Sequence, residues 1–198
     1  MNKLLPPLFP IALIFLGCGS DKQDLPIENR PQINGATEER TVKINGTLYL
    51  NGSDTPYTGK VFSSYQSGQR KSEESYANGK SDGLKTFWYK DGNIMQKMNY
   101  KDGKLHGSNI MWLNNGKKYF EINSKNGRRD GPNIYWYKNG QKRSEENYKE
   151  GKQDGLFTSW HENGQKRSEV NYMDGNQISG KYWNSKGHSV NSYDETLK

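Results

Sequence analysis

The chain has 198 residues, a formal net charge of +7 and a hydrophobic content of only 30%. So few apolar residues cannot fill the core of a two-layer sandwich, which takes apolar side chains from both of its inner faces. The single cysteine excludes an internal disulfide framework.

The chain begins with a short apolar segment. Residues 1–17 carry one lysine and then an apolar run, Leu4 to Leu16, that contains three prolines. This run is about half of the ~20 residues that a membrane-spanning helix needs. A positive start, a short apolar stretch and a small residue at its end are typical of a secretory signal peptide, so residues 1–17 are left out of the fold.

Cys18 follows this signal directly. The sequence Phe15-Leu16-Gly17-Cys18 resembles the lipobox of bacterial lipoproteins, which implies cleavage before Cys18 and lipid attachment to its sulfur and its new amino group. Gly19 in place of aspartate implies transport to the outer membrane if the bacterium has two membranes. The alternative is an ordinary cleaved signal with an incidental cysteine. We therefore expect a chain that a lipid on Cys18 holds at the cell envelope, on its periplasmic or surface side.

Two irregular segments come next. Residues 18–40 are polar and show no apolar periodicity, so we predict a flexible tether that cannot offset its ordering entropy. In residues 41–59, apolar residues alternate around Asn45-Gly46, a pair typical of tight turns. We predict an irregular capping hairpin there, because the first unit of a repeat array has no neighbour to cover it.

From there on the sequence repeats with a period of 24 residues. Glycine recurs in three columns, and tryptophan and tyrosine recur in two more, with Ser124 in place of one tyrosine. Self-similarity at a fixed period indicates a repeat architecture. The columns are Gly59, Gly83, Gly107, Gly131 and Gly155; Gly68, Gly92, Gly116, Gly140 and Gly164; Gly79, Gly103, Gly127, Gly151 and Gly175; Trp88, Trp112, Trp136 and Trp160; and Tyr76, Tyr100, Tyr148 and Tyr172.

Each repeat has the pattern of a β-hairpin. Residues 84–90 and 94–101 are rich in β-branched and aromatic residues. Asp91-Gly92 between them favours a two-residue turn, and a longer link over 102–107 leads to the next hairpin. No segment shows the 3.6-residue period of a helix.

We therefore predict an all-β fold in which 24-residue β-hairpins form an elongated, single-layer antiparallel meander sheet. The repeats are expected over 60–187, followed by a frayed tail over 188–198. Alternation within the strands predicts one aromatic face, with the tryptophan and tyrosine columns, and one charged face, with the glutamates and asparagines of the second strand.

The pattern G-K-x-x-G-x-x-x-x-W-Y-x-N-G-Q-K-x-x-E-x-x-Y is similar to the MORN-type repeat. More closely, the chain resembles the YwqK-type antitoxin-like repeat proteins, and residues 56–83 and 135–155 carry this resemblance. The resemblance covers most of the chain after residue 40. It implies a sheet of β-hairpins that acts by binding, and the family name comes from a few members that neutralise a toxin.

Two sets of side chains are candidates for binding a partner. The aromatic columns are either structural ladders or, in part, a surface for a protein or a carbohydrate, because Trp, Tyr and Arg dominate interface hot spots. Basic pairs follow the hairpin turns and form either a solvated face paired with nearby glutamates or a docking stripe for an acidic protein or anionic headgroups. The candidates are Trp88, Trp112, Trp136, Trp160, Tyr89, Tyr137, Arg70, Lys71, Lys142, Arg143, Lys166 and Arg167.

The sequence shows no pattern of catalysis or of metal binding. His106, His161 and His188 lie far apart and at different places in the repeat, and no HxxxH or CxxC spacing occurs. A repeat also argues against an active site, because catalysis needs unlike groups that converge once. We expect no enzyme, no metal site and no cofactor.

We predict a non-enzymatic cell-envelope lipoprotein whose repeat sheet binds a partner protein. One alternative is an antitoxin or immunity-type protein that neutralises a toxin by direct binding. Another is an accessory module for anionic lipid or glycan. Nucleic acid is not expected as a partner, because an exported lipoprotein rarely meets it, and the sequence leaves the oligomeric state open.

Overall fold

The computed structural model describes residues 35–197. It contains a 15-stranded sheet and a separate two-stranded sheet. The predicted signal 1–17, Cys18 and the tether up to residue 34 lie outside the described residues. The elements are β1 (Ala36–Thr37), η2 (Glu38–Arg40), β2 (Thr41–Ile44), β3 (Thr47–Leu50), β4 (Gly59–Ser64), β5 (Arg70–Ala77), β6 (Lys80–Trp88), β7 (Ile94–Lys101), β8 (Lys104–Trp112), β9 (Lys118–Lys125), β10 (Arg128–Arg129), β11 (Gly131–Trp136), β12 (Lys142–Lys149), β13 (Lys152–Gln153), β14 (Gly155–Trp160), β15 (Lys166–Met173), β16 (Asn176–Trp183), β17 (Ser189–Val190) and η3 (Asp194–Leu197).

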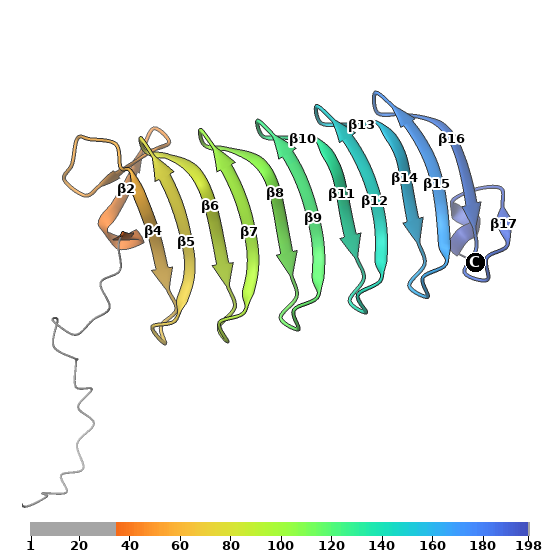
Figure 1. Ribbon diagram of the computed structural model, residues 1–198, viewed down its shortest axis with the longest axis horizontal. Helices are drawn as coiled ribbons and strands as arrows, with labels where there is room; N and C mark the ends of the chain where they lie inside the picture. Colours follow the sequence, from red (N-terminus) through yellow and green to blue (C-terminus); the bar gives the residue numbers. More distant parts are fainter. Residues whose placement is uncertain (1–34, 198) are drawn as a thin grey trace, which may run out of the picture. The chain divides into compact units, whose positions relative to one another are not determined.

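The large sheet is a long meander one layer thick (Figure 1). From β4 to β17 the strands pair antiparallel in chain order, and the short strands β10 and β13 extend the pairing of β9 and β12. At the edge of the sheet, β1 runs parallel to β4. The all-β meander of repeated hairpins that the sequence predicts is confirmed.

Two kinds of turn alternate along the sheet, and their places are the reverse of those predicted. The links between hairpins are the two-residue turns: Asp102 and Gly103 have φ values of 49° and 78°, as a type I′ turn requires. Asp91-Gly92 instead belongs to a wider loop, in which only Gly92 has a positive φ, 88°, and donates its N–H to the Tyr89 carbonyl. There the Asp91 carboxylate accepts the N–H of Asn93 at 3.0 Å, so the same dipeptide stabilises a different turn.

The register between strands places tryptophan and tyrosine on opposite faces. In the hairpin of β14 and β15, Thr158 pairs with Glu169, whereas Gly155 pairs with Tyr172. Because Thr158 shares a face with Trp160, that face also carries the glutamate. The predicted separation into an aromatic and a charged face was therefore wrong, since alternation within a strand does not give the register between strands. We call the two sides the tryptophan face and the tyrosine face.

Tyrosine hydroxyls join successive hairpins at the edge where the wider loops lie. Tyr89 Oη donates to the Trp112 carbonyl and Tyr137 Oη donates to the Trp160 carbonyl, each at 2.8 Å. Leu113 stands at the equivalent position of the hairpin between them, so that hairpin lacks the bond. The two tyrosines are thus fixed by contacts within the sheet.

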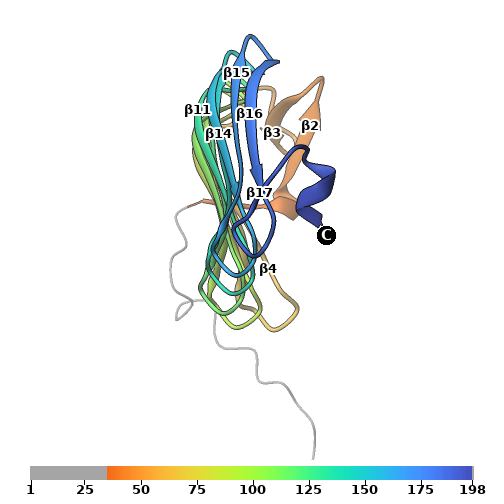
Figure 2. The ribbon, with the colours of Figure 1, turned by 90° about the vertical axis from the view of Figure 1, so that its right-hand side faces the viewer.

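The N-terminal hairpin of β2 and β3 covers one end of the tyrosine face (Figure 2). Leu48 is 4% exposed and packs in one apolar cluster with Val61 and Tyr76 of the sheet. Ala36 belongs to the same cluster, and β1 pairs with β4. The prediction of a tether that extends to residue 40 was therefore wrong for residues 36–40, because burial of Ala36 ties them to the sheet.

The C-terminal segment covers the other end of the same face (Figure 2). Arg167 Nε donates to Oγ1 of Thr196 in η3 at 2.9 Å, and Thr196 is 3% exposed. The Tyr193 ring meets Tyr182 edge-on, with 6.4 Å between ring centres. The predicted frayed tail was wrong for residues 188–197, because Tyr193 and Thr196 interrupt the polar sequence and pack on the sheet.

Beneath the N-terminal hairpin, a carboxylate accepts three hydrogen bonds. The Glu74 carboxylate accepts hydrogen bonds from Ser81 Oγ at 2.6 Å, Lys85 Nζ at 2.8 Å and Tyr76 Oη at 2.9 Å. Burial alone would raise the pKa of Glu74, but these three donors outweigh burial and hold its pKa below the ordinary value.

The Tyr137→Phe variant tests the hydroxyl bond between hairpins. It keeps the ring and loses the bond to the Trp160 carbonyl, so the free energy of unfolding should fall by about 1 kcal/mol. Tyr119→Phe is the control, because the Tyr119 hydroxyl forms no hydrogen bond within residues 35–197 and its ring packs near Phe120. Urea unfolding at pH 7 measures both variants, and equal losses would contradict a contribution from the bond.

The Glu74→Gln variant tests the carboxylate beneath the hairpin. Because its folded-state pKa lies below the unfolded value of about 4.3, Glu74 stabilises the fold above that pH and loses this effect as the pH falls through the folded-state pKa. The variant should lower the free energy of unfolding by about 1–3 kcal/mol at pH 7, and the difference from wild type should shrink towards pH 3.

Urea unfolding at both pH values gives the comparison. Glu145→Gln is the control, because Glu145 is 37% exposed and its pair with Lys142 should contribute little. A difference between Glu74→Gln and wild type that stays constant from pH 7 to pH 3 would contradict the depressed pKa.

Candidate binding surfaces

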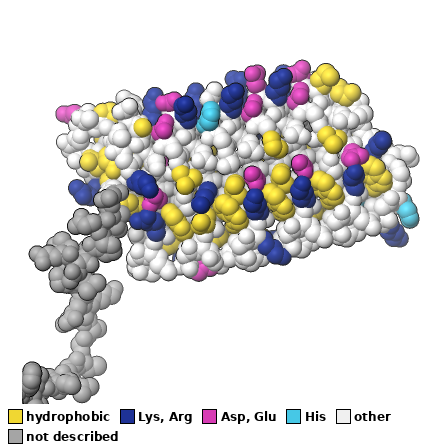
Figure 3. Space-filling view, viewed as in Figure 1, with side chains coloured by type: hydrophobic (Ala, Val, Ile, Leu, Met, Phe, Trp, Pro, Cys, Tyr) yellow, Lys and Arg dark blue, Asp and Glu magenta, His cyan; other side chains and the backbone are white. Residues whose placement is uncertain are grey.

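On the tryptophan face, cations from one strand lie over the tryptophan rings of the next. Lys142 Nζ is 5.8 Å from the ring centre of Trp160 and pairs with Glu145 at 2.7 Å. The lysine stem thus covers the indole while the glutamate neutralises the ammonium group. Figure 3 shows these groups as a band of hydrophobic and charged side chains across the face. The arrangement recurs at Arg70 with Trp88 and Glu73, at Lys118 with Trp136 and Glu121, and at Lys166 with Trp183 and Glu169.

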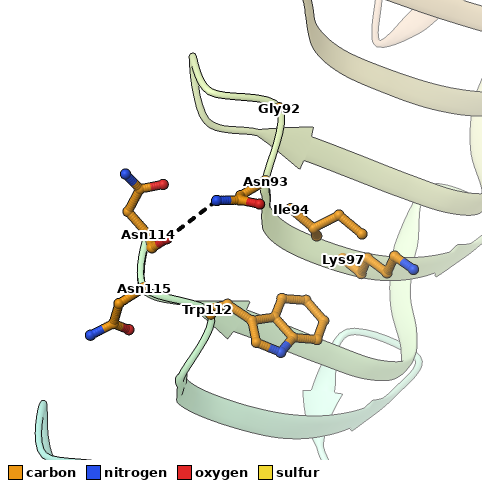
Figure 4. Close-up of a pocket in the computed structure, with 8 residues that line it drawn as sticks. Gly92, Asn93, Ile94, Lys97, Trp112, Asn114 and Asn115 are labelled. Carbon is orange, nitrogen blue, oxygen red and sulfur yellow. Dashed lines mark hydrogen bonds between the residues drawn. The ribbon is translucent and has the colours of Figure 1, made fainter.

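Trp112 lacks this cover. The residue that would lie over its ring is Ile94 rather than a cation, and the glutamate position three residues later is occupied by Lys97. Within residues 35–197, Trp112 has no cation over its ring and Lys97 has no ion-pair partner. Ile94, Lys97 and Trp112 line a hollow of about 690 Å³ (Figure 4). We call it the Trp112 hollow.

Two hairpin turns form the rim of the Trp112 hollow. Asn93 Nδ2 of one turn donates to the carbonyl of Asn114 in the next at 3.4 Å (Figure 4). Asn115 Oδ1 accepts the N–H of Lys117 at 3.1 Å, which leaves the amide NH₂ group of Asn115 as a donor for a ligand. The hollow therefore combines an aromatic wall, amide groups and one unneutralised cation.

The candidate aromatic residues differ in whether their hydroxyl groups and rings already make contacts within the sheet. Tyr89 and Tyr137 donate to backbone carbonyls of the next hairpin. Trp88, Trp136 and Trp160 lie under cations, as described above. Among the four candidate tryptophans, only Trp112 has no cation from residues 35–197 over its ring.

The structure also separates the basic pairs that were considered as one stripe. Their first members, Arg70, Lys142 and Lys166, lie on the tryptophan face in ion pairs. On the tyrosine face, Arg143 lies 5.4 Å from the Tyr135 ring centre.

The two remaining second members lie at the ends of the sheet. Arg167 lies 4.3 Å from the Tyr193 ring centre, under the C-terminal segment. Lys71 lines a hollow with Glu38 and Glu39 near the N-terminal edge. The six basic candidates therefore do not form one continuous surface.

Segments β2–β3 and η3 lie on the same side of the sheet (Figure 2) and cover the two ends of the tyrosine face, and the described residues leave the part between them open. The open part carries half-buried apolar and aromatic side chains from neighbouring strands, and no second layer of the described chain lies over them. We call it the open tyrosine face. Its members are Phe87, Met98, Met111, Phe120, Ile122 and Tyr135.

Two exposed arginines border the open tyrosine face. Arg129 donates to Tyr148 Oη at 3.0 Å, and Arg143 lies over Tyr135. Neither arginine forms an ion pair within residues 35–197. Burial and the hydrogen bond to Glu146 raise the pKa of Tyr148, so its phenol is neutral at physiological pH. This border therefore carries two guanidinium groups and one carboxylate, that of Glu146, which accepts the Tyr148 hydroxyl at 2.8 Å.

The sequence reasoning missed most of these residues. Met111 stands one position before the tryptophan column and Phe120 stands four positions after a glycine column, and their pairing across β8 and β9 is visible only once the register is known. Ile94 and Lys97, by contrast, are breaks in two columns of the 24-residue repeat, and comparing the units position by position could have found them.

Within residues 35–197, no group of three or more His, Cys, Asp or Glu side chains could hold a metal ion. No helix in the same range has the length and apolar character needed to cross a membrane.

The repeats match a known family model. The MORN repeat variant matches residues 57–78, 81–102, 129–150 and 153–174. The hairpin of β8 and β9 lies between the second and third matches and has the same pairing, although Leu113 and Ser124 replace tyrosines of the repeat. No curated protein matches the chain. The regular spacing of the matches and the hairpin meander agree, and the chain is a MORN repeat variant protein.

Proposed function

We propose that this protein acts by binding, as a cell-envelope lipoprotein whose open tyrosine face receives a segment of a partner protein. One observation carries this function: within residues 35–197 the chain covers both ends of the tyrosine face with its own segments and leaves the apolar middle without a second layer. Removing apolar surface from water is favourable by roughly 25 cal/mol per Å². A partner would bury the apolar middle of the face, as β2–β3 and η3 bury its two ends.

The two covered ends also limit the shape of the partner. A layer packed on a sheet lies about 10 Å from it, so the N-terminal hairpin and η3 form walls of about that height. A second flat sheet of the same length cannot reach the surface between such walls. A single helix or hairpin, about 10 Å across, can lie between them.

The chemistry of the partner follows from the residues that it would meet. Met111 and Phe120 offer an apolar surface, whereas Arg129 and Arg143 offer guanidinium groups that form no ion pair within residues 35–197. We infer an amphipathic segment that is apolar along one side and acidic where it meets the arginines, because charge complementarity sets specificity and association rate.

The place of action rests on the N-terminal sequence. Phe15-Leu16-Gly17-Cys18 supports a lipid anchor, and the polar residues that follow would act as a tether. Gly19 supports the outer membrane as the destination in a bacterium with two membranes. The repeat sheet would then meet its partner in the periplasm or at the cell surface.

A closer kinship with the YwqK-type antitoxin-like repeat proteins is part of the same proposal, on residues 56–83 and 135–155. In that case the partner is a toxin or an effector enzyme, and binding neutralises it by occlusion. Binding to anionic lipid is the other alternative, because Arg129 and Arg143 would also attract anionic headgroups.

Charge reversal of two neighbouring arginines tests which face binds. Arg129 pairs with Ser124 on the tyrosine face, and Arg128 pairs with Lys125 on the opposite face. Arg129→Glu should reduce capture of the partner at least about tenfold, because it places a carboxylate against the acidic segment, and Met111→Lys should do the same by placing a charge in the apolar contact. The measurement is a crosslinking pull-down from native membranes with the tagged mature chain.

Arg128→Glu is the matched control, since it changes the net charge equally and should keep the partner. Equal capture by all three variants, or equal loss in Arg128→Glu and Arg129→Glu, would contradict the assignment to the tyrosine face. Binding to anionic vesicles that disappears at high salt, with no protein captured, would replace the partner protein by lipid.

The Cys18→Ser variant tests the anchor. Without the thiol no lipid can be attached, so the chain should move from the membrane fraction to the soluble fraction. Fractionation and immunoblotting of cells that express each form measure the change. A Cys18→Ser chain that is fully exported and remains membrane-bound as before would refute the lipid anchor.

A further inference from the structure

The Trp112 hollow on the tryptophan face has the features of a ligand site, and we propose that it binds a hexopyranose unit that carries a carboxylate. The hollow lies on the opposite face from the open tyrosine face. Binding there is therefore independent of the partner protein proposed above, and either can fail without the other.

The charges around Trp112 differ from those in the other units at both positions: the cation is replaced by an apolar residue and the carboxylate by a cation. At Trp160, the Lys142 stem covers the indole and Glu145 neutralises the ammonium group. At Trp112 the covering position holds Ile94, which is 37% exposed, and the carboxylate position holds Lys97. Within residues 35–197 this unit thus has an indole without a cation over it and a lysine without an ion-pair partner, and a ligand with an apolar face and an anion would complete both.

A pyranose ring with a carboxylate meets these requirements together. The C–H groups on one face of the ring form a flat apolar surface of a size that the indole can cover. Hydroxyl groups at the ring edge can bond the amides of Asn93 and Asn115 on the rim. The carboxylate can accept a charge-assisted hydrogen bond from Lys97.

Other ligand classes leave some of these groups unused. A purely apolar group would cover Trp112 but would leave Lys97 and the amide NH₂ group of Asn115 without partners. A neutral sugar would satisfy the indole and the amides but would leave Lys97 unpaired. A site with one aromatic wall and a few convergent polar groups is typical of small-molecule recognition, and about 690 Å³ lies within the usual range of such sites, about 300–1,000 Å³.

Titration with tetragalacturonic acid tests the assignment, with maltotetraose as the neutral probe of equal length. The indole N–H signals of the five tryptophans can be followed by NMR in the mature chain. The Trp112 signal should shift and saturate with tetragalacturonic acid, and maltotetraose should bind at least about tenfold more weakly because Lys97 has no partner. Lys97→Gln should remove most of this difference.

A double variant closes the hollow by restoring the repeat. Ile94→Lys combined with Lys97→Glu gives this unit the arrangement found around Trp160. It should fold as wild type and lose the saccharide, because its own side chains cover the indole and remove the free cation. Trp160→Phe is the control in a covered unit and should bind as wild type.

Three results would overturn the assignment. The first is the absence of a saturable shift of Trp112 with tetragalacturonic acid. The second is equal binding by wild type and the double variant. The third is saturation by an acetylated peptide of aspartate and glutamate without any response to tetragalacturonic acid, which would assign the hollow to an acidic peptide instead.

Discussion

A sheet one layer thick leaves both faces of every strand in contact with water unless neighbouring side chains cover one another. In this protein the cover is built into the 24-residue repeat: the Lys142 stem lies over Trp160, and Glu145 neutralises the lysine. Each such group joins adjacent strands, so it forms only if the register is kept. The hydroxyl bond from Tyr137 to the Trp160 carbonyl holds that register, and the stability of the sheet is thus a sum of contacts between nearest neighbours.

The same constraint explains why the chain folds back on its sheet at both ends. A terminal strand has a neighbour on one side only, so its side chains lack half of the cover that the repeat supplies. The N-terminal hairpin buries Val61 and Tyr76, and the C-terminal segment packs Tyr193 against Tyr182. Both segments lie on the tyrosine face, where a lysine–glutamate pair beside an aromatic ring occurs once within residues 35–197, at Lys85, Glu74 and Phe87 near the N-terminal hairpin, and does not recur along the sheet. The apolar and aromatic side chains in the middle of that face also need cover that the repeat does not supply.

Much of the fold could be predicted because its signals are local. Glycine columns mark turns, alternating residues mark strands, and a fixed period marks repetition. The relation between strands could not be predicted, because it depends on register: Thr158 faces Glu169 through pairing that no single strand encodes. The same limit applies to the turns, since Asp102-Gly103 and Asp91-Gly92 are identical in sequence and form different loops.

The candidate sites were predictable only where they break the repeat. Trp112 was a candidate together with Trp136, and nothing in the tryptophan column separates them; the difference lies in Ile94 and Lys97, which become neighbours of Trp112 only in the folded sheet. In a repeat protein a regular position is explained by the scaffold, because every unit needs it. A position where one unit departs, and where the departure leaves an indole and a cation without partners, has no scaffold explanation. Most positions of the repeat stabilise the sheet, and the positions that depart from the repeat can instead bind a ligand.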